Sequence, residues 1–130
     1  MELKLTLLFG MLFLHIVDDY YLQGWLASAK QRRWWEKNCP NEMYKNDYIM
    51  ALCEHAFSWT FMIMLIPMLW GYFHYWENYS GWIILFAYNW TMHSVVDNYK
   101  ANLKTINLVQ DQLFHMFQVL ITWIFTIFIF

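Results

Sequence analysis

The chain has 130 residues, and its composition is not that of a soluble globular protein. Apolar residues make up 60% and charged residues 14%, whereas soluble domains average about 45–50% and about 25%. The net charge of −2 is too small for a nucleic-acid-binding protein, and the basic residues lie in loops rather than along one stripe. The composition therefore favours a single domain, residues 1–130, embedded in a membrane.

The first apolar segment spans residues 3–26 and is followed by a polar, basic stretch at residues 29–47. The sequence Cys39-Pro40-Asn41 predicts a turn in the middle of that stretch. Trp34 and Trp35 stand beside its basic side chains, a combination typical of a segment that lies at the membrane interface. A solvated loop is the alternative interpretation.

Three further apolar segments follow, at residues 48–72, 81–99 and 106–130. All four segments are close to the roughly 20 residues that a helix needs to cross the hydrocarbon core. None alternates strictly between polar and apolar residues, which argues against a membrane β-barrel. We therefore predict an all-α fold, an up-and-down bundle of four transmembrane helices with an interfacial basic segment between the first two.

The distribution of basic residues predicts the orientation of this bundle. The connections at residues 29–47 and 100–105 lie on one side and carry seven Lys and Arg, whereas the opposite side carries only Lys4. Because cytoplasmic loops are enriched in Lys and Arg, the basic loops are expected in the cytoplasm and both termini outside. The location expected is a cell inner membrane.

A histidine and an aspartate stand four positions apart three times within these apolar segments. Positions i and i+4 share one face of a helix, so each pair presents an imidazole beside a carboxylate. On four alternating helices, all three pairs and one further histidine fall into one layer in the cytoplasmic half of the bilayer. These seven residues are His15, Asp19, His55, His93, Asp97, Asp111 and His115.

Four imidazoles and three carboxylates in one layer match the ligand preferences of Zn, Mn or Fe. They exceed what one tetrahedral ion uses, so we expect a divalent metal site with room for two ions. Three unpaired aspartates at mid-membrane would cost on the order of 9 kcal/mol, at about 2.5–3.5 each. Metal coordination worth roughly 10 kcal/mol or more offsets that cost.

Two other interpretations of the same residues stay open. Each pair can be a hydrogen-bonded couple within its own helix, with no joint site. Alternatively, the layer can conduct protons or ions, which is a common use of ionisable residues in membranes.

In order and spacing, these residues resemble those of the small integral membrane proteins of bacteria and phages grouped as domain of unknown function 3307. The elements that carry the resemblance are His15-Ile-Val-Asp-Asp19 with Gln23 and Lys30, then His55, His93-Ser-Val-Val-Asp97 with Lys100, and Asp111-Gln112-Leu-Phe-His115. The resemblance covers nearly the whole chain. A looser similarity to small membrane-bound metal-dependent hydrolases implies metal-assisted hydrolysis.

The resemblance also marks residues beside the predicted ligands. We assign supporting roles around the metal to Asp18 and Gln112, and headgroup binding to Lys30. Lys100 at the cytoplasmic boundary can attract a phosphate, although simple snorkelling explains it too. Gln23, Glu54 and Lys100 are the candidates for catalytic roles, with Glu54 as a possible general base.

Together these features predict a metal-dependent hydrolase of a phosphoester or lipid-like substrate, acting at the cytoplasmic leaflet of the lipid bilayer. The alternative is a non-enzymatic membrane protein, as a homo-oligomer or a monomer, that conducts protons or ions or perturbs the membrane in a phage- or defence-related role.

Overall fold

The computed structural model describes residues 2–74 and 79–128, and this part of the chain is helical with no strand. Four long helices dominate it: α1 (Glu2–Val17), α4 (Asp47–His74), α5 (Tyr79–Asn98) and α6 (Leu108–Phe128). Shorter elements lie between them: η1 (Asp18–Leu22), α2 (Leu26–Ala29), α3 (Arg32–Asn38), η2 (Glu42–Tyr44) and η3 (Tyr99–Leu103). The predicted all-α class is confirmed.

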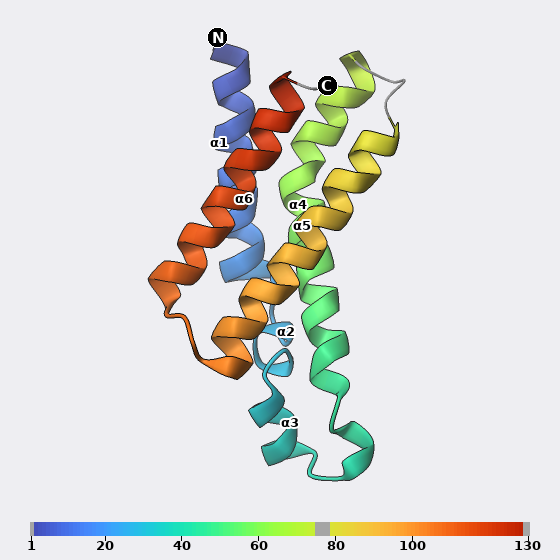
Figure 1. The fold of residues 1–130 in the computed structure, drawn as a ribbon, viewed down its shortest axis with the longest axis vertical. Coiled ribbons are helices and arrows are strands. Elements are labelled where there is room, and N and C mark those ends of the chain that lie inside the picture. The colour runs from blue at the N-terminus through green and yellow to red at the C-terminus, as the bar shows by residue number, and fades with distance from the viewer. Residues whose placement is uncertain (1, 75–78, 129–130) are drawn as a thin grey trace.

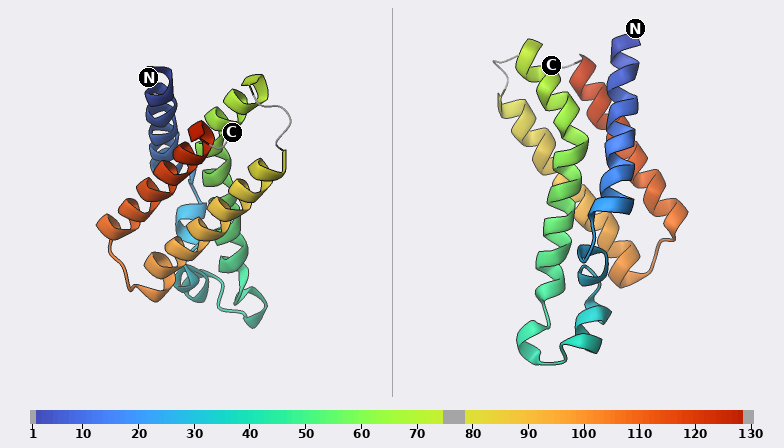
Figure 2. Two further views of the ribbon diagram at one scale, coloured as in Figure 1. Left: turned by 45° about the horizontal axis from the view of Figure 1, so that its top comes forward. Right: turned by 180° about the vertical axis from the view of Figure 1, so that it is seen from behind.

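The long helices form a bundle in which each contacts its neighbours in turn (Figures 1 and 2). Helix α1 packs against α4, α4 against α5, α5 against α6, and α6 returns to α1. The start of α1 and the end of α6 lie at one end of the bundle, while α2, α3 and η3 lie toward the other (Figure 1). This arrangement gathers the basic connections at the end opposite the termini.

A cluster of buried apolar side chains packs at the centre of the bundle, between the predicted polar layer and the chain ends. They come from α1, α4, α5 and α6, and they are Met11, Trp59, Ile63, Met64, Leu85 and Val119. Large apolar side chains also cover the outside, for example Phe9 and Phe13 on α1 and Phe117 on α6. A helical bundle that is apolar both inside and outside is the pattern expected in lipid.

Three stretches are long and apolar enough to cross a membrane, Glu2–Leu22, Glu42–Phe73 and Leu108–Phe128. Helix α5 has 20 residues but is less apolar, because it carries Asn89, His93 and Asp97. Its expected bounds, residues 81–99, lie close to those observed. The last two residues of the expected fourth segment, residues 106–130, fall outside the described part of the chain.

The first segment differs from the prediction of one helix over residues 3–26. Helix α1 ends at Val17, continues as the π-helical turn η1, and the chain then breaks at Gly24 before α2. Gly24 has a φ of 48°, a left-handed conformation that glycine adopts without the steric cost other residues meet. Beyond this break, Lys30 at the end of α2 reaches the bundle and donates a hydrogen bond to Asp97 of α5.

Candidate metal centre

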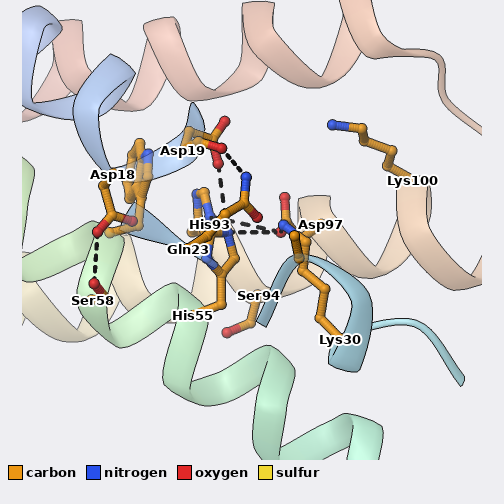
Figure 3. Close-up of polar contacts among 12 residues, drawn as sticks. Asp18, Asp19, Gln23, Lys30, His55, Ser58, His93, Ser94, Asp97 and Lys100 are labelled. Carbon is orange, nitrogen blue, oxygen red and sulfur yellow. Dashed lines mark hydrogen bonds and ion pairs between the residues drawn. The ribbon is translucent and has the colours of Figure 1, made fainter. Parts of the chain in front are cut away.

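Four elements bring six residues of the predicted polar layer together at the basic end of the bundle, and Lys30 joins them from a fifth. Asp19 comes from the π-helical turn η1, His55 from α4, and His93 and Asp97 from α5. Asp111 and His115 come from the first two turns of α6, and Lys30 follows α2. Figure 3 shows the side chains of Asp19, His55, His93 and Asp97 converging, with Lys30 beside Asp97. Both π-helical turns, η1 and η3, adjoin this cluster, as such turns often do at functional sites.

His55 links two carboxylates from different helices. Its Nε2 atom lies 3.5 Å from Asp19 Oδ1 and 3.2 Å from Asp97 Oδ2. The same atom is 3.2 Å from His93 Nε2. Asp19, His55 and His93, all buried, form the first group whose ligand atoms lie close enough together to hold one ion.

His93, Asp97 and His115 form the second such group, and His93 belongs to both. His115 Nε2 lies 3.3 Å from Asp97 Oδ1 and 3.4 Å from Asp111 Oδ1, and His93 Nε2 lies 3.9 Å from Asp97 Oδ2. Asp97 therefore directs its two oxygens toward different imidazoles. A carboxylate in this position can bridge two ions.

These separations fit a coordination shell. Ligands held at about 2.0–2.1 Å by a tetrahedral zinc ion lie roughly 3.3 Å apart. Neither His115 Nε2 nor Asp111 Oδ1 meets hydrogen-bond geometry with any described residue, although the two atoms are 3.4 Å apart and fully buried. The donor set of imidazole and carboxylate and these unsatisfied atoms therefore fit a divalent metal.

Two lysines neutralise part of the negative charge. Lys30 Nζ contacts Asp97 Oδ2 at 2.6 Å, and Lys100 Nζ contacts Asp111 Oδ2 at the same distance. Burial, the largest single effect, lowers the pKa of Lys100, but the hydrogen bond with Asp111 and the charges of Asp111, Asp97 and Asp19 together raise it. Three carboxylates thus face two ammonium groups, which leaves one negative charge at the cluster and favours binding of a cation.

His15 lies in the same layer but both of its ring nitrogens are engaged by other side chains. Trp59 donates its indole N–H to His15 Nδ1 at 2.8 Å. The Nε2 atom must then carry the proton and donate to Gln112 Oε1 at 3.1 Å. His15 does not belong to either ligand group, so in this arrangement it positions Gln112 rather than offering a free nitrogen.

Gln112 lies beside the predicted ligands and contacts two of the carboxylates. Its amide nitrogen donates to Asp19 Oδ2 at 2.8 Å and to Asp111 Oδ2 at 3.2 Å. Trp59 contacts the cluster a second time, because its ring stacks on His93 with centroids 4.1 Å apart. A chain of contacts thus runs from Trp59 through His15 and Gln112 to two carboxylates, fixing their orientation as outer groups do around metal ligands.

The other predicted residues lie at the margin or outside. Asp18 is buried but points away from the cluster and accepts a hydrogen bond from Ser58 Oγ at 2.6 Å (Figure 3). Gln23 donates to the Asp19 carbonyl oxygen and leaves its own Oε1 without a partner among the described residues. Glu54 is exposed, since it lies about 100° around α4 from His55, and the structure does not bring it to the cluster.

Sequence reasoning missed Trp59 and a set of uncharged polar residues deeper in the bundle. Asn89 on α5 donates to Thr122 Oγ1 on α6 at 2.8 Å, and Gln118 donates to the Asn89 carbonyl oxygen at 3.2 Å. All three side chains are buried. On α6, Gln118 and Thr122 follow His115 at steps of three and four residues and so share its face of the helix. The sequence does contain this signal.

Comparison with known proteins gives no relative for this chain: no family model, no curated protein and no solved structure matches it.

Proposed function

We propose that the protein is a membrane-embedded metalloprotein that hydrolyses a phosphoester or lipid-like substrate at the basic end of its bundle. Helices α1, α4, α5 and α6 would all cross the bilayer, with the basic loops in the cytoplasm and both termini outside. The buried imidazoles and carboxylates contributed by four elements support the metal site. The resemblance to the proteins grouped as domain of unknown function 3307 remains a prediction.

The observation that carries the proposal is a pair of buried ligand atoms, His115 Nε2 and Asp111 Oδ1, that lie at coordination distance and make no hydrogen bond with any described residue. His115 Nε2 lies between oxygens of Asp97 and Asp111, at 3.3 and 3.4 Å, without hydrogen-bond geometry to either. If the carboxylates served only as intrahelical partners of histidines, these atoms would be satisfied, because buried polar groups rarely go unpaired. Their convergence is better explained by an ion.

When bound, a divalent ion would activate a water molecule and polarise a phosphoryl oxygen. The chain supplies the rest of the chemistry. Lys30 and Lys100 hold their ammonium groups against Asp97 and Asp111, next to where a scissile phosphate would lie. Glu54 is exposed, so Asp19 and Asp97 are better placed than Glu54 to accept a proton from an attacking water.

Metal analysis of the purified protein tests this proposal directly. The wild-type protein should carry at least one Zn, Mn or Fe ion per chain, and a chelator should abolish hydrolysis of a generic phosphoester until metal is added back. His93→Gln and Asp97→Asn should each weaken metal binding by at least about 100-fold, because losing a ligand costs more than losing a group behind it. Glu54→Gln is the matched control and should bind metal normally. A correctly folded wild-type protein without bound metal, or one that cannot be reloaded with it, would overturn the proposal.

A second candidate, a proton pathway, is favoured by the polar face of α6. This face forms a stripe of five buried polar side chains along the helix: Asp111, His115, Gln118, Thr122 and Thr126. At 1.5 Å per residue, the fifteen steps from Asp111 to Thr126 span roughly 22 Å, most of the hydrocarbon core of about 30 Å. Buried oxygens of Asn89 and Gln118 lack partners in the described part of the chain, as expected where ordered water binds.

Proton flux in proteoliposomes separates this candidate from the hydrolase. A pathway predicts flux in the metal-free protein that Gln118→Leu reduces strongly, since an apolar side chain interrupts the stripe. The hydrolase predicts no flux above that of empty liposomes and unchanged metal content in Gln118→Leu.

A further inference from the structure

A cavity of about 480 Å³ opens beside the candidate metal centre, between α2, η3 and the segment that precedes α6. Asp97, which belongs to the second ligand group, also lines this cavity. The cavity therefore provides access from the basic end of the bundle to the otherwise buried cluster. Its other polar lining residues are Gln23, Gln31, Lys30, Lys100 and Lys104.

The charge of this lining is strongly positive. Three lysines face one carboxylate, Asp97, and that carboxylate is already paired with Lys30 at 2.6 Å. Lys100 is paired with Asp111, which lies outside the cavity lining. Lys104 makes no ion pair with any described residue. One ammonium group is thus uncommitted, and the others lie at the boundary between the cavity and the metal ligands.

The cavity walls are held in place before any ligand arrives. Asn102 in η3 donates to the Lys30 carbonyl oxygen at 3.1 Å and accepts from the Arg32 backbone N–H at 2.7 Å. Lys104 follows η3 with a φ of 56°, a left-handed conformation that a non-glycine residue adopts at some cost. Its backbone N–H bonds to the Tyr99 carbonyl oxygen, which fixes that conformation. The wall formed by η3 is therefore tied to α2 and α3.

We propose that this cavity binds a phosphate group through Lys104, Lys30 and Lys100, and so delivers a phosphate-bearing substrate to the metal centre. Lysine is a common phosphate ligand, and charge-assisted hydrogen bonds are about twice as strong as neutral ones. Phosphate is favoured over carboxylate because it presents oxygens to three cations at once. The substrate role rests on the proposed hydrolase function, but phosphate binding itself does not require a metal.

The test uses the full chain, treated with a chelator, with inorganic phosphate and phosphatidic acid as the two probes. Inorganic phosphate is titrated by calorimetry in detergent, and phosphatidic acid is presented in phosphatidylcholine nanodiscs and scored by native mass spectrometry. Lys104→Gln should weaken binding by about tenfold or more, as expected for one lost charged hydrogen bond. Lys104→Arg should restore it. Lys37→Gln on the exposed surface of α3 removes an equal charge outside the cavity and should have no effect.

Each result decides the proposal. Lys104-dependent binding of both probes supports a site for the phosphate group itself, and binding of phosphatidic acid alone supports a lipid source. Equal losses in Lys104→Gln and Lys37→Gln would show that only overall charge matters, and the proposal would fall. Binding of neither probe would also overturn it. A protein that binds phosphate but no metal would refute the hydrolase while leaving the cavity site intact, so the two failures are distinguishable.

Discussion

Four histidines in one layer differ in role because of their immediate neighbours. His15 accepts from the Trp59 indole and faces Gln112, so neither ring nitrogen is free. The Nε2 atoms of His55, His93 and His115 instead lie 3.2–3.9 Å from carboxylate oxygens. The i, i+4 spacing predicts the same role for His15 as for His93 and His115. The role of His15 differs because Trp59, on another helix, donates a hydrogen bond to it.

This difference predicts losses of metal affinity of unequal size. His115→Gln should remove a ligand and lower metal affinity by at least about 100-fold, whereas His15→Gln should lower it by about 10- to 100-fold through misplacement of Gln112. Metal titration of both variants with a fluorescent chelator competitor measures the difference. Equal losses would instead make His15 a direct ligand. Circular dichroism of both variants controls for folding.

Lys30 leads to a second prediction at this scale, because it is paired with a carboxylate that is 2% exposed. Lys30→Met leaves Asp97 without its cation and should destabilise the metal-free protein by about 3–5 kcal/mol. A saturating divalent ion should recover much of that loss, since the ion replaces the missing positive charge and binds only the folded state. Denaturant unfolding in mixed micelles, with and without metal, gives both values. If metal stabilised wild type and variant equally, Lys30 and the ion would act independently.

At the scale of helices, the sequence predicted which residues share a face better than where each helix ends. The couples His93/Asp97 and Asp111/His115 lie within 3.9 and 3.4 Å, as their spacing requires. The contacts between Asp97 and the two histidines of other helices, His55 and His115, depend on helix packing that no single spacing encodes. The break at Gly24 was missed because the apolar pattern continues past it to residue 26.

At two glycines the helices lie so close together that an added Cβ atom would meet a side chain of the neighbouring helix. A Cβ atom at Gly71 of α4 would collide with the rigid ring of Trp82 on α5, whereas one at Gly10 of α1 would meet only the flexible end of Ile66. Gly71→Ala should therefore destabilise the bundle by about 1–3 kcal/mol. Gly10→Ala should have a much smaller effect. Thermal unfolding of the two variants in the same detergent compares them, and equal stability would show that Trp82 has room to move.

At the scale of the whole molecule, α5 shows how a helix can be low in average hydropathy although its outer face is apolar. Its polar residues Asn89, His93 and Asp97 are all buried against other helices. Its outer face carries Ile83 and Ile84, which are 68% and 69% exposed. A helix can thus be polar in composition and still present an apolar surface to lipid, because a bundle hides its polar face. Composition counts both faces, which is why only three stretches are long and apolar enough by that measure.

The position of the two chain ends leads to a prediction about whether α5 crosses the membrane. The start of α1 and the end of α6 lie at the same end of the bundle, which requires an even number of crossings (Figure 1). In a chain lacking Cys39 and Cys53, the variants Glu2→Cys and Phe128→Cys should react with a membrane-impermeant maleimide on intact cells. Lys37→Cys should react only after permeabilisation, because seven of the eight basic residues lie on its side and the proposed orientation therefore puts that side in the cytoplasm. Labelling of Glu2→Cys but not Phe128→Cys would show that α5 does not cross. If instead Lys37→Cys reacted on intact cells and the two terminal sites reacted only after permeabilisation, the orientation would be inverted and the candidate metal centre would lie near the outer leaflet.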